Sequence, residues 1–324
     1  MVTTDNSNIK HIVIPDDYPP VFLDSNAINR LRRVPNVSLK IFNDRLTDTD
    51  ELIEKLKGAH TVIITRSSTK INSNVLESNN NKLRHISILG TATDNIDTNI
   101  AKHKEILITS TPDTHIESVA EHALALMLSL AKRIPQLDQR VRHGEWPRGN
   151  ITLLRGKTLG IIGTGRVGET LKEIAEGIGM NVISYSLQDK NSRSKDHIFG
   201  NSSSKKLFYD ILRESDIISL HARLSPETQY LISSEELSFM KPTAFLVNTA
   251  RGGLIKEEDL VVALQNSTIH GAALDVFDQE PITSSALKKL SNVILSPHIA
   301  GSTEESLSIS LNQVVDSVID NIGY

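Results

Sequence analysis

One stretch constrains the fold of this chain more than any other: KTLGIIGTGRVGETLKEIAEGIG, residues 157–179. Gly163, Gly165 and Gly168 have the spacing G-x-G-x-x-G, with an apolar strand pattern before them and an amphipathic helix pattern after them. In such a unit the first glycine permits a tight turn, the second lets the backbone approach a pyrophosphate, and the third lets the helix pack closely on the strand. The helix N-terminus adds N–H groups and a positive dipole end. Glycines also mark ordinary turns, and methyltransferases carry a related turn, but the strand–turn–helix context favours a dinucleotide-binding α/β unit.

Short apolar runs alternate with amphipathic stretches along the rest of the chain, which indicates α/β layers. The first third predicts buried parallel strands at 11–15, 37–41, 61–65, 85–89 and 106–110. The second series begins at residue 157 and predicts further strands near 182–185, 216–220, 244–248, 269–273 and 293–295. Helices are expected at 47–58, 116–133 and 303–322, and a polar surface loop at 191–206. With 324 residues, two domains are the natural expectation.

Composition excludes several classes of protein and site. The net charge is −4 and no basic stretch is interleaved with aromatic residues, which argues against nucleic-acid binding. The chain has no cysteine and its histidines are scattered, so disulfides, thiolate metal sites and other metal centres are not expected. The longest apolar run, near 123–131, is too short for a membrane span, and the N-terminus lacks the order of a secretory signal. We expect a soluble, cytoplasmic protein.

Six motifs together resemble the D-isomer-specific 2-hydroxyacid dehydrogenases, a family that includes phosphoglycerate, glyoxylate, hydroxypyruvate and D-lactate dehydrogenases. They are SVAEHALALML (118–128), LGIIGTGRVGE (159–169), SLHARLSPET (219–228), MKPTAFLVNTARGGLIKEEDL (240–260), GAALDVFDQEP (271–281) and ILSPHIAGST (294–303). The resemblance covers essentially the whole chain. It implies a Rossmann dinucleotide-binding domain at 107–296 and a split, flavodoxin-like α/β substrate-binding domain at 1–106 and 297–324, with the active site in the cleft between them. It also implies a homodimer formed through the long apolar helix at 116–133.

The same resemblance assigns three catalytic residues: Arg251 in NTARGG, Glu280 in DVFDQEP and His298 in SPHIAG. Reduction of a 2-keto acid needs a proton for the carbonyl oxygen, and histidine can give and take one near neutral pH. A carboxylate beside an imidazole favours its protonated form, raises its pKa and orients the ring. A guanidinium can bind the substrate carboxylate through two donors and polarise the carbonyl. Singly, each residue also fits an ordinary surface or turn position; a glutamate at 280, where formate-oxidising relatives have glutamine, argues against formate as substrate.

Two loops of the first third resemble the family's substrate loops. ITRSSTKI (64–71) resembles an R-S-x-T loop that binds the acidic end of the substrate, which implicates Arg66 and Ser67. LGTATDNID (89–97) resembles the loop whose N–H groups hold the substrate carboxylate, with candidate contacts at Thr91, Ala92 and Asn95. Ala92 replaces the family's second glycine and narrows the allowed backbone angles, and Asn95 could contact substrate or cap a turn. No aromatic cluster lies in these loops, which favours a small, polar keto acid.

Ser186 occupies the position where family members that prefer NAD carry an acid. That acid bonds the ribose hydroxyls and repels a 2′-phosphate, so serine removes the repulsion. Lys190, Arg193 and Arg223 could bind the phosphate, or they could be solvated loop charges. We expect NADP to be favoured over NAD, with use of both. The implied cofactor-binding set is Gly163, Gly165, Arg166, Val167, Gly168, Ser186, Lys190, Arg193, His221, Arg223, Thr228, Thr249, Ala250 and Asp275, the last matching a residue that bonds the nicotinamide carboxamide.

The sequence thus predicts an NAD(P)-dependent oxidoreductase that transfers hydride between a nicotinamide cofactor and a small 2-keto or 2-hydroxy acid of the glyoxylate or hydroxypyruvate type. Two alternatives remain open at this stage. Arg66 and Ser67 suit a D-3-phosphoglycerate dehydrogenase. A non-catalytic, nucleotide-sensing corepressor is the other, although the complete set of Arg251, Glu280 and His298 argues against it.

Overall fold

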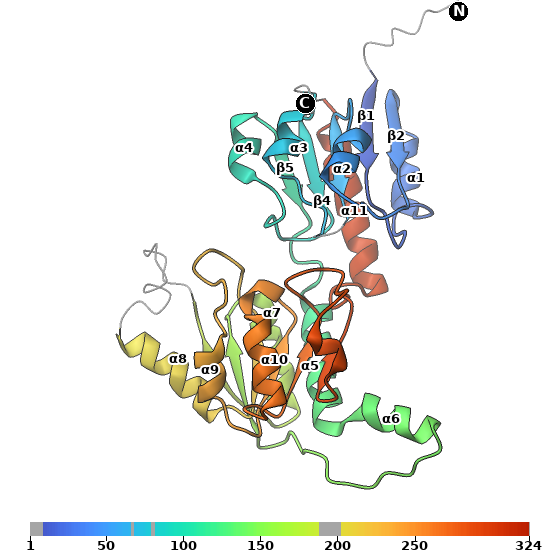
Figure 1. Cartoon of the computed structure of the whole chain (residues 1–324). Coiled ribbons are helices and arrows are strands. Elements are labelled where there is room, and N and C mark those ends of the chain that lie inside the picture. Colours follow the sequence, from blue (N-terminus) through green and yellow to red (C-terminus); the bar gives the residue numbers. More distant parts are fainter. Residues whose placement is uncertain (1–8, 66–67, 79–81, 188–201, 324) are drawn as a thin grey trace, which may run out of the picture. The chain divides into compact units, whose positions relative to one another are not determined.

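The structure is a computed structural model that describes residues 9–65, 68–78, 82–187 and 202–323 (Figure 1). The chain divides into two compact units. The first unit comprises residues 1–115 and 304–324, and the second comprises residues 116–303. Each is an α/β unit with a parallel sheet, which confirms the predicted fold class.

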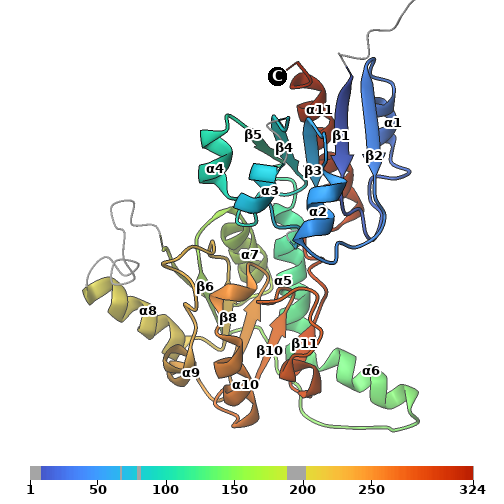
Figure 2. The same cartoon turned by 45° about the horizontal axis from the view of Figure 1, so that its top comes forward.

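The first unit has a five-stranded sheet in the order β2-β1-β3-β4-β5, the flavodoxin-like order. Its strands are β1 (Lys10–Ile14), β2 (Val37–Ile41), β3 (Thr61–Ile64), β4 (His85–Ile88) and β5 (Leu107–Ser110). Its helices are α1 (Asn26–Arg32), α2 (Thr49–Lys55), α3 (Ser73–Ser78), α4 (Thr98–His103) and the C-terminal α11 (Glu304–Asp320). Because side chains alternate along a strand, Val13 packs with α2 and α3, whereas Ile12 and Ile14 pack with α1 and α11. Helices therefore cover both faces of this sheet (Figure 2).

The second unit has a six-stranded sheet in the order β11-β10-β9-β8-β6-β7. Its strands are β6 (Thr158–Ile162), β7 (Asn181–Tyr185), β8 (Ile217–Leu220), β9 (Phe245–Asn248), β10 (Gly271–Leu274) and β11 (Val293–Leu295). Its helices are α5 (Ile116–Lys132), α6 (Ile134–Arg142), α7 (Arg166–Gly177), α8 (Ser202–Glu214), α9 (Ser234–Phe239) and α10 (Glu257–Gln265), with 3-10 turns at Gly252–Leu254 and Ala286–Lys289. The chain leaves β6 toward β7 on one side and returns to β8 on the other. Ligands of doubly wound sheets bind beyond the carboxyl ends of the strands at such a switch point.

The domain boundaries differ from those predicted at 107–296. β5 begins at Leu107 but pairs in parallel with β4, so it belongs to the first sheet. At the other end, the N–H groups of Ile299 and Ala300 bind Asp275, which holds residues 297–303 to the second unit. The predicted surface loop at 191–206 is also too long, since α8 begins at Ser202; its earlier part lies outside the described residues.

The long helix α5 is buried within its own unit. Ala120, Ala123, Met127 and Leu130 pack with residues of α7, β9 and β10 in one hydrophobic cluster. This burial accounts for an apolar pattern that the sequence interpretation assigned to a dimer contact. The pattern of α5 is therefore not, by itself, evidence for a partner chain.

Candidate active site

The glycine-rich turn follows β6 and has the geometry that a pyrophosphate cradle requires. Gly163 has φ 106°, and a Cβ added there would lie 2.6 Å from the carbonyl carbon of His221. A Cβ on Gly168 would lie 2.3 Å from the carbonyl oxygen of Gly163. Around a Cβ on Gly165, by contrast, the structure has nothing within 4 Å, and this residue caps the N-terminus of α7. Two glycines thus permit close packing and the third leaves open space at a helix N-terminus, which fits a phosphate group.

Other predicted cofactor residues lie at the carboxyl ends of the neighbouring strands. Ser186 directly follows β7 and is exposed, and Arg166 at the start of α7 is exposed as well, while Val167 is half-buried. His221 follows β8, where its Nε2 lies 2.8 Å from the Ser219 hydroxyl and burial lowers its pKa to about 4. Its ring is therefore neutral at physiological pH.

The loop after β8 is closed by Thr228. Its hydroxyl donates to the carbonyl of Arg223 (2.6 Å) and accepts from the N–H of Ser225 (2.8 Å). Arg223 itself is exposed, so its guanidinium is accessible from solvent. Lys190 and Arg193, the other two predicted phosphate ligands, lie outside the described residues.

The loop after β9 presents Arg251. The Asn248 side chain supports it from both ends: its oxygen accepts from the N–H of Ala250 (3.0 Å), and its amide donates to the carbonyl of Arg251 (2.8 Å). Between them, the Thr249 hydroxyl is buried and has no hydrogen-bond partner in the described part of the chain. A buried polar atom in this state is a natural contact for a bound polar ligand.

Gly252 brings the Arg251 loop against the loop that carries Glu280. A Cβ at position 252 would lie 1.9 Å from the carbonyl carbon of Phe277 and 2.3 Å from the nitrogen of Asp278. Only glycine permits this contact of one main chain with another. The spacing between the arginine loop and the acid loop is therefore set by backbone packing.

His298 and Glu280 form the catalytic pair that the motifs predicted. His298 Nδ1 lies 2.7 Å from Glu280 Oε2, and the other oxygen of Glu280 accepts the N–H of Phe277 at 3.1 Å. Because an ionised carboxylate only accepts hydrogen bonds, Nδ1 carries the proton of this contact and Nε2 is the ring nitrogen left for a substrate. His298 has φ 55°, a left-handed conformation that costs a non-glycine residue of order 1–3 kcal/mol and persists only where its surroundings enforce it.

Asp275, which follows β10, is completely buried. Its carboxylate accepts hydrogen bonds from the Ser296 hydroxyl and from the N–H groups of Ile299 and Ala300, and His122 Nε2 of α5 lies 3.5 Å away. Burial alone would raise the pKa of Asp275, but these contacts outweigh it and hold the pKa below its usual value. Sequence reasoning did not find His122 or Ser296; its role for Asp275, a bond to the nicotinamide carboxamide, stays a prediction.

The predicted substrate residues belong to the first unit. In loop 89–97, all of which is described, Gly90 alone has a positive φ, so Ala92 has backbone angles open to alanine. Thr91 is exposed, whereas Asn95 is buried and donates to the carbonyl of Thr69 at 2.8 Å. Of the two interpretations of Asn95, this contact favours the turn-supporting one. Arg66 and Ser67 lie outside the described residues.

Two searches of the described residues found nothing. No group of three or more histidine, aspartate or glutamate side chains among them could hold a metal ion. No helix in this part of the chain is long and apolar enough to span a membrane.

Comparison with known proteins identifies the family. Residues 124–300 match the family model for the NAD-binding domain of D-isomer-specific 2-hydroxyacid dehydrogenases. Glyoxylate reductase of Pyrococcus furiosus is 35% identical over 314 residues, which cover 93% of this chain and 91% of that protein. D-3-phosphoglycerate dehydrogenase of Methanocaldococcus jannaschii is 40% identical over 262 residues, 79% of this chain but only 48% of that longer protein.

The fold comparison agrees. The crystal structure of D-lactate dehydrogenase from Aquifex aeolicus, complexed with NAD and lactic acid, has a TM-score of 0.80 and 29% identity, covering 97% of this chain and 96% of that one. The family predicted from six motifs is confirmed by a domain match that includes Arg251, Glu280 and His298. The chain belongs to the D-isomer-specific 2-hydroxyacid dehydrogenase family.

Proposed function

We propose that this protein is an NAD(P)-dependent dehydrogenase that interconverts a small 2-keto acid and the corresponding D-2-hydroxy acid, working mainly as a glyoxylate or hydroxypyruvate reductase. The observation that carries the proposal is the 2.7 Å contact between His298 and Glu280. That contact lies at the same edge of the second sheet as Arg251 and the glycine-rich turn, because all four follow the carboxyl ends of parallel strands. An acid–base pair, an anion-binding cation and a dinucleotide cradle at one sheet edge are the parts that this reaction needs.

Each residue has a defined task in the reduction. The Arg251 guanidinium binds the substrate carboxylate and polarises the adjacent carbonyl. His298 donates the Nε2 proton to the carbonyl oxygen, and in the reverse direction it removes that proton. Glu280 keeps the imidazole in the orientation that allows this transfer and stabilises its protonated form. The nicotinamide of the bound cofactor supplies or accepts the hydride.

For the cofactor we propose that NADPH is preferred and NADH is also used. Ser186 is exposed directly after β7, where an acidic side chain would repel a 2′-phosphate. Arg223 is exposed on the loop after β8. Together they replace a repulsive charge by a neutral hydroxyl and add an accessible cation.

Initial rates with glyoxylate, hydroxypyruvate and phosphohydroxypyruvate, measured with NADPH and NADH at matched subsaturating concentrations, test both proposals. Ser186→Asp should shift the NADPH-to-NADH ratio toward NADH by roughly tenfold or more, equivalent to about 1.4 kcal/mol, because the new carboxylate repels the phosphate. Ser186→Ala is the uncharged control and should leave the ratio close to that of the natural protein.

Three outcomes of these measurements would change the assignment. Tenfold tighter binding of NADH than of NADPH by the natural protein would refute the cofactor preference. A strong preference for phosphohydroxypyruvate would favour a phosphoglycerate dehydrogenase, the name of one relative of similar sequence. Absence of turnover with all three acids would refute the reductase proposal.

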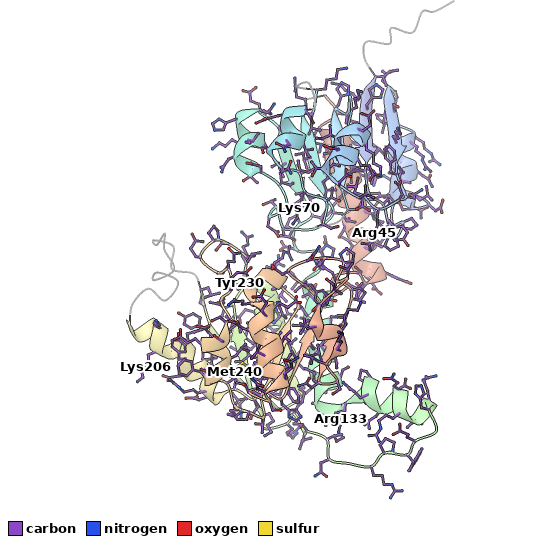
Figure 3. The ribbon with its side chains drawn as sticks, viewed as in Figure 1. Arg45, Lys70, Arg133, Lys206, Tyr230 and Met240 are labelled. Carbon is purple, nitrogen blue, oxygen red and sulfur yellow. The ribbon has the colours of Figure 1, made fainter. Side chains whose placement is uncertain are left out.

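We also propose that the protein is a homodimer, held together by residues 134–153. In the described chain α6 buries none of its side chains, and in Figures 1 and 2 this helix and the loop after it extend away from the rest of the second unit. Arg133, labelled in Figure 3, lies at the bend between α5 and α6. Trp146 is 76% exposed and Leu153 is 65% exposed. Apolar side chains gathered on one projecting segment indicate a surface that a second copy covers.

Light scattering coupled to gel filtration measures the oligomeric state. The natural protein should have the mass of a dimer, and the double variant Trp146→Glu with Leu153→Glu should have that of a monomer, because burying two carboxylates in the interface is unfavourable. Val262→Glu on α10, which alters another exposed apolar residue, is the matched control. A monomeric natural protein would disprove the proposal.

A further inference from the structure

The segment that carries His298 is held by one buried carboxylate. Asp275 Oδ1 accepts the hydroxyl of Ser296 (2.6 Å) and the N–H of Ile299 (3.0 Å), and Oδ2 accepts the N–H of Ala300 (2.9 Å). These donors lie on both sides of His298 in the sequence. A single side chain therefore fixes the chain before and after the acid–base residue.

A count of protons shows how Asp275 is itself held. The Ser296 hydroxyl has one hydrogen, and it donates this hydrogen to Asp275. His122 Nε2 lies 3.1 Å from the Ser296 oxygen and 3.5 Å from Asp275 Oδ1. Since the serine hydrogen is already committed and the ionised carboxylate has none to give, His122 Nε2 must carry a proton and act as the donor.

The helix α5 provides a second attachment to the same segment. Ser118 lies one turn before His122 on this helix, and its hydroxyl donates to the carbonyl of Ala300 at 2.6 Å. Residues four apart share one face of a helix. The two side chains thus connect a buried helix to the active-site segment from a single face.

The backbone of His298 needs such support. Its φ of 55° lies in the left-handed region, which an unsupported histidine leaves readily. The N–H groups of the two residues that follow it donate to Asp275. Loss of the carboxylate would release both groups and let the segment relax away from Glu280.

We propose that Asp275 is a positioning residue for proton transfer: with Ser296 and His122 it holds His298 against Glu280. This role rests on the proposed function, and it is separate from any contact that Asp275 makes with the cofactor. The two roles make different demands. A positioning residue affects kcat and the His298–Glu280 contact, whereas a nicotinamide ligand affects the affinity for the cofactor.

The test compares Asp275→Asn, which keeps the size of the side chain but loses one acceptor oxygen, with Asp275→Ala. For each variant kcat and KM for hydroxypyruvate, the Kd for NADPH, and the downfield ¹H resonance of the His298 Nδ1–H are measured. That resonance is assigned by its absence in His298→Ala. We expect kcat to fall about 10²-fold, the Kd for NADPH to stay within about threefold of its natural value, and the downfield resonance to disappear or move upfield.

Two further variants probe the supporting side chains. His122→Gln keeps a donor and should lose less kcat than His122→Leu, which keeps none. Glu236→Gln is the matched control for the loss of a buried carboxylate: Glu236 accepts from the N–H (3.0 Å) and hydroxyl (2.6 Å) of Ser233 in α9, remote from the His298 segment in its contacts. It should leave kcat and the resonance unchanged.

Each contrary result has a distinct meaning. Unchanged kcat and an unchanged resonance in Asp275→Asn and Asp275→Ala would overturn the proposal. A loss confined to the affinity for NADPH would also overturn it, in favour of the carboxamide contact. If the natural protein reduces none of the keto acids, the proposed function fails, but loss or retention of the resonance still decides whether Asp275 holds His298 against Glu280.

Discussion

Replacement of His298 by alanine is expected to lower kcat for keto-acid reduction by about 10²–10⁴-fold, the usual contribution of a general acid–base group. The variant should still fold and bind the cofactor, because the glycine-rich turn is formed by other residues. The loss follows from the geometry, since His298 is the residue that Glu280 orients at 2.7 Å. Steady-state rates, circular dichroism and a cofactor titration measure the three properties separately.

Glu280→Gln is the companion variant. Glutamine keeps an oxygen that can accept the Nδ1 hydrogen of His298 and the N–H of Phe277, but it removes the charge that stabilises the imidazolium. Its kcat should therefore lie between those of the natural protein and His298→Ala. Turnover close to the natural rate in His298→Ala would remove this residue from the mechanism.

Replacement of Arg251 by alanine is expected to lower kcat/KM by roughly 10³-fold, because two charge-assisted hydrogen bonds to the substrate carboxylate are lost. Arg251→Lys should recover little, since an ammonium restores the charge but not the planar, two-pronged donor. The effect should fall on both kcat and KM, because the guanidinium also polarises the reacting carbonyl.

The control for Arg251 is Arg213→Ala in α8, which removes an exposed guanidinium paired with Asp210. It should leave both kinetic constants unchanged. Recovery of most of the activity in Arg251→Lys would show that charge alone is required, and it would contradict the two-pronged contact.

Much of the fold could be predicted because it depends on local patterns. Parallel strands buried on both faces have short apolar runs, and the run at 61–65 corresponds to β3. The turn at Gly163 needs a glycine for its positive φ and its contact with His221, so its sequence carries the signal. The boundary at β5 could not be found this way, because the apolar run does not say which sheet its strand joins.

The catalytic pair and its support differ in the same respect. His298 and Glu280 each lie in a motif with chemical meaning, so the resemblance identifies them. His122 and Ser296 are ordinary polar residues in sequence, separated by more than a hundred positions, and only the packing of α5 on the sheet brings them to Asp275. Asn95 shows the converse, since a residue in a substrate-like motif has a side chain that supports the carbonyl of Thr69.

The contact of Gly252 with the backbone of Phe277 restricts how this enzyme can be redesigned. Any side chain at position 252 would push the arginine loop away from the acid loop, whatever the substrate. Libraries that aim at new keto acids should therefore leave 252 as glycine and vary the loops of the first unit, such as 89–97. Natural divergence faces the same restriction: substrate choice can change in one unit while the distance from anion-binding arginine to acid stays constant in the other.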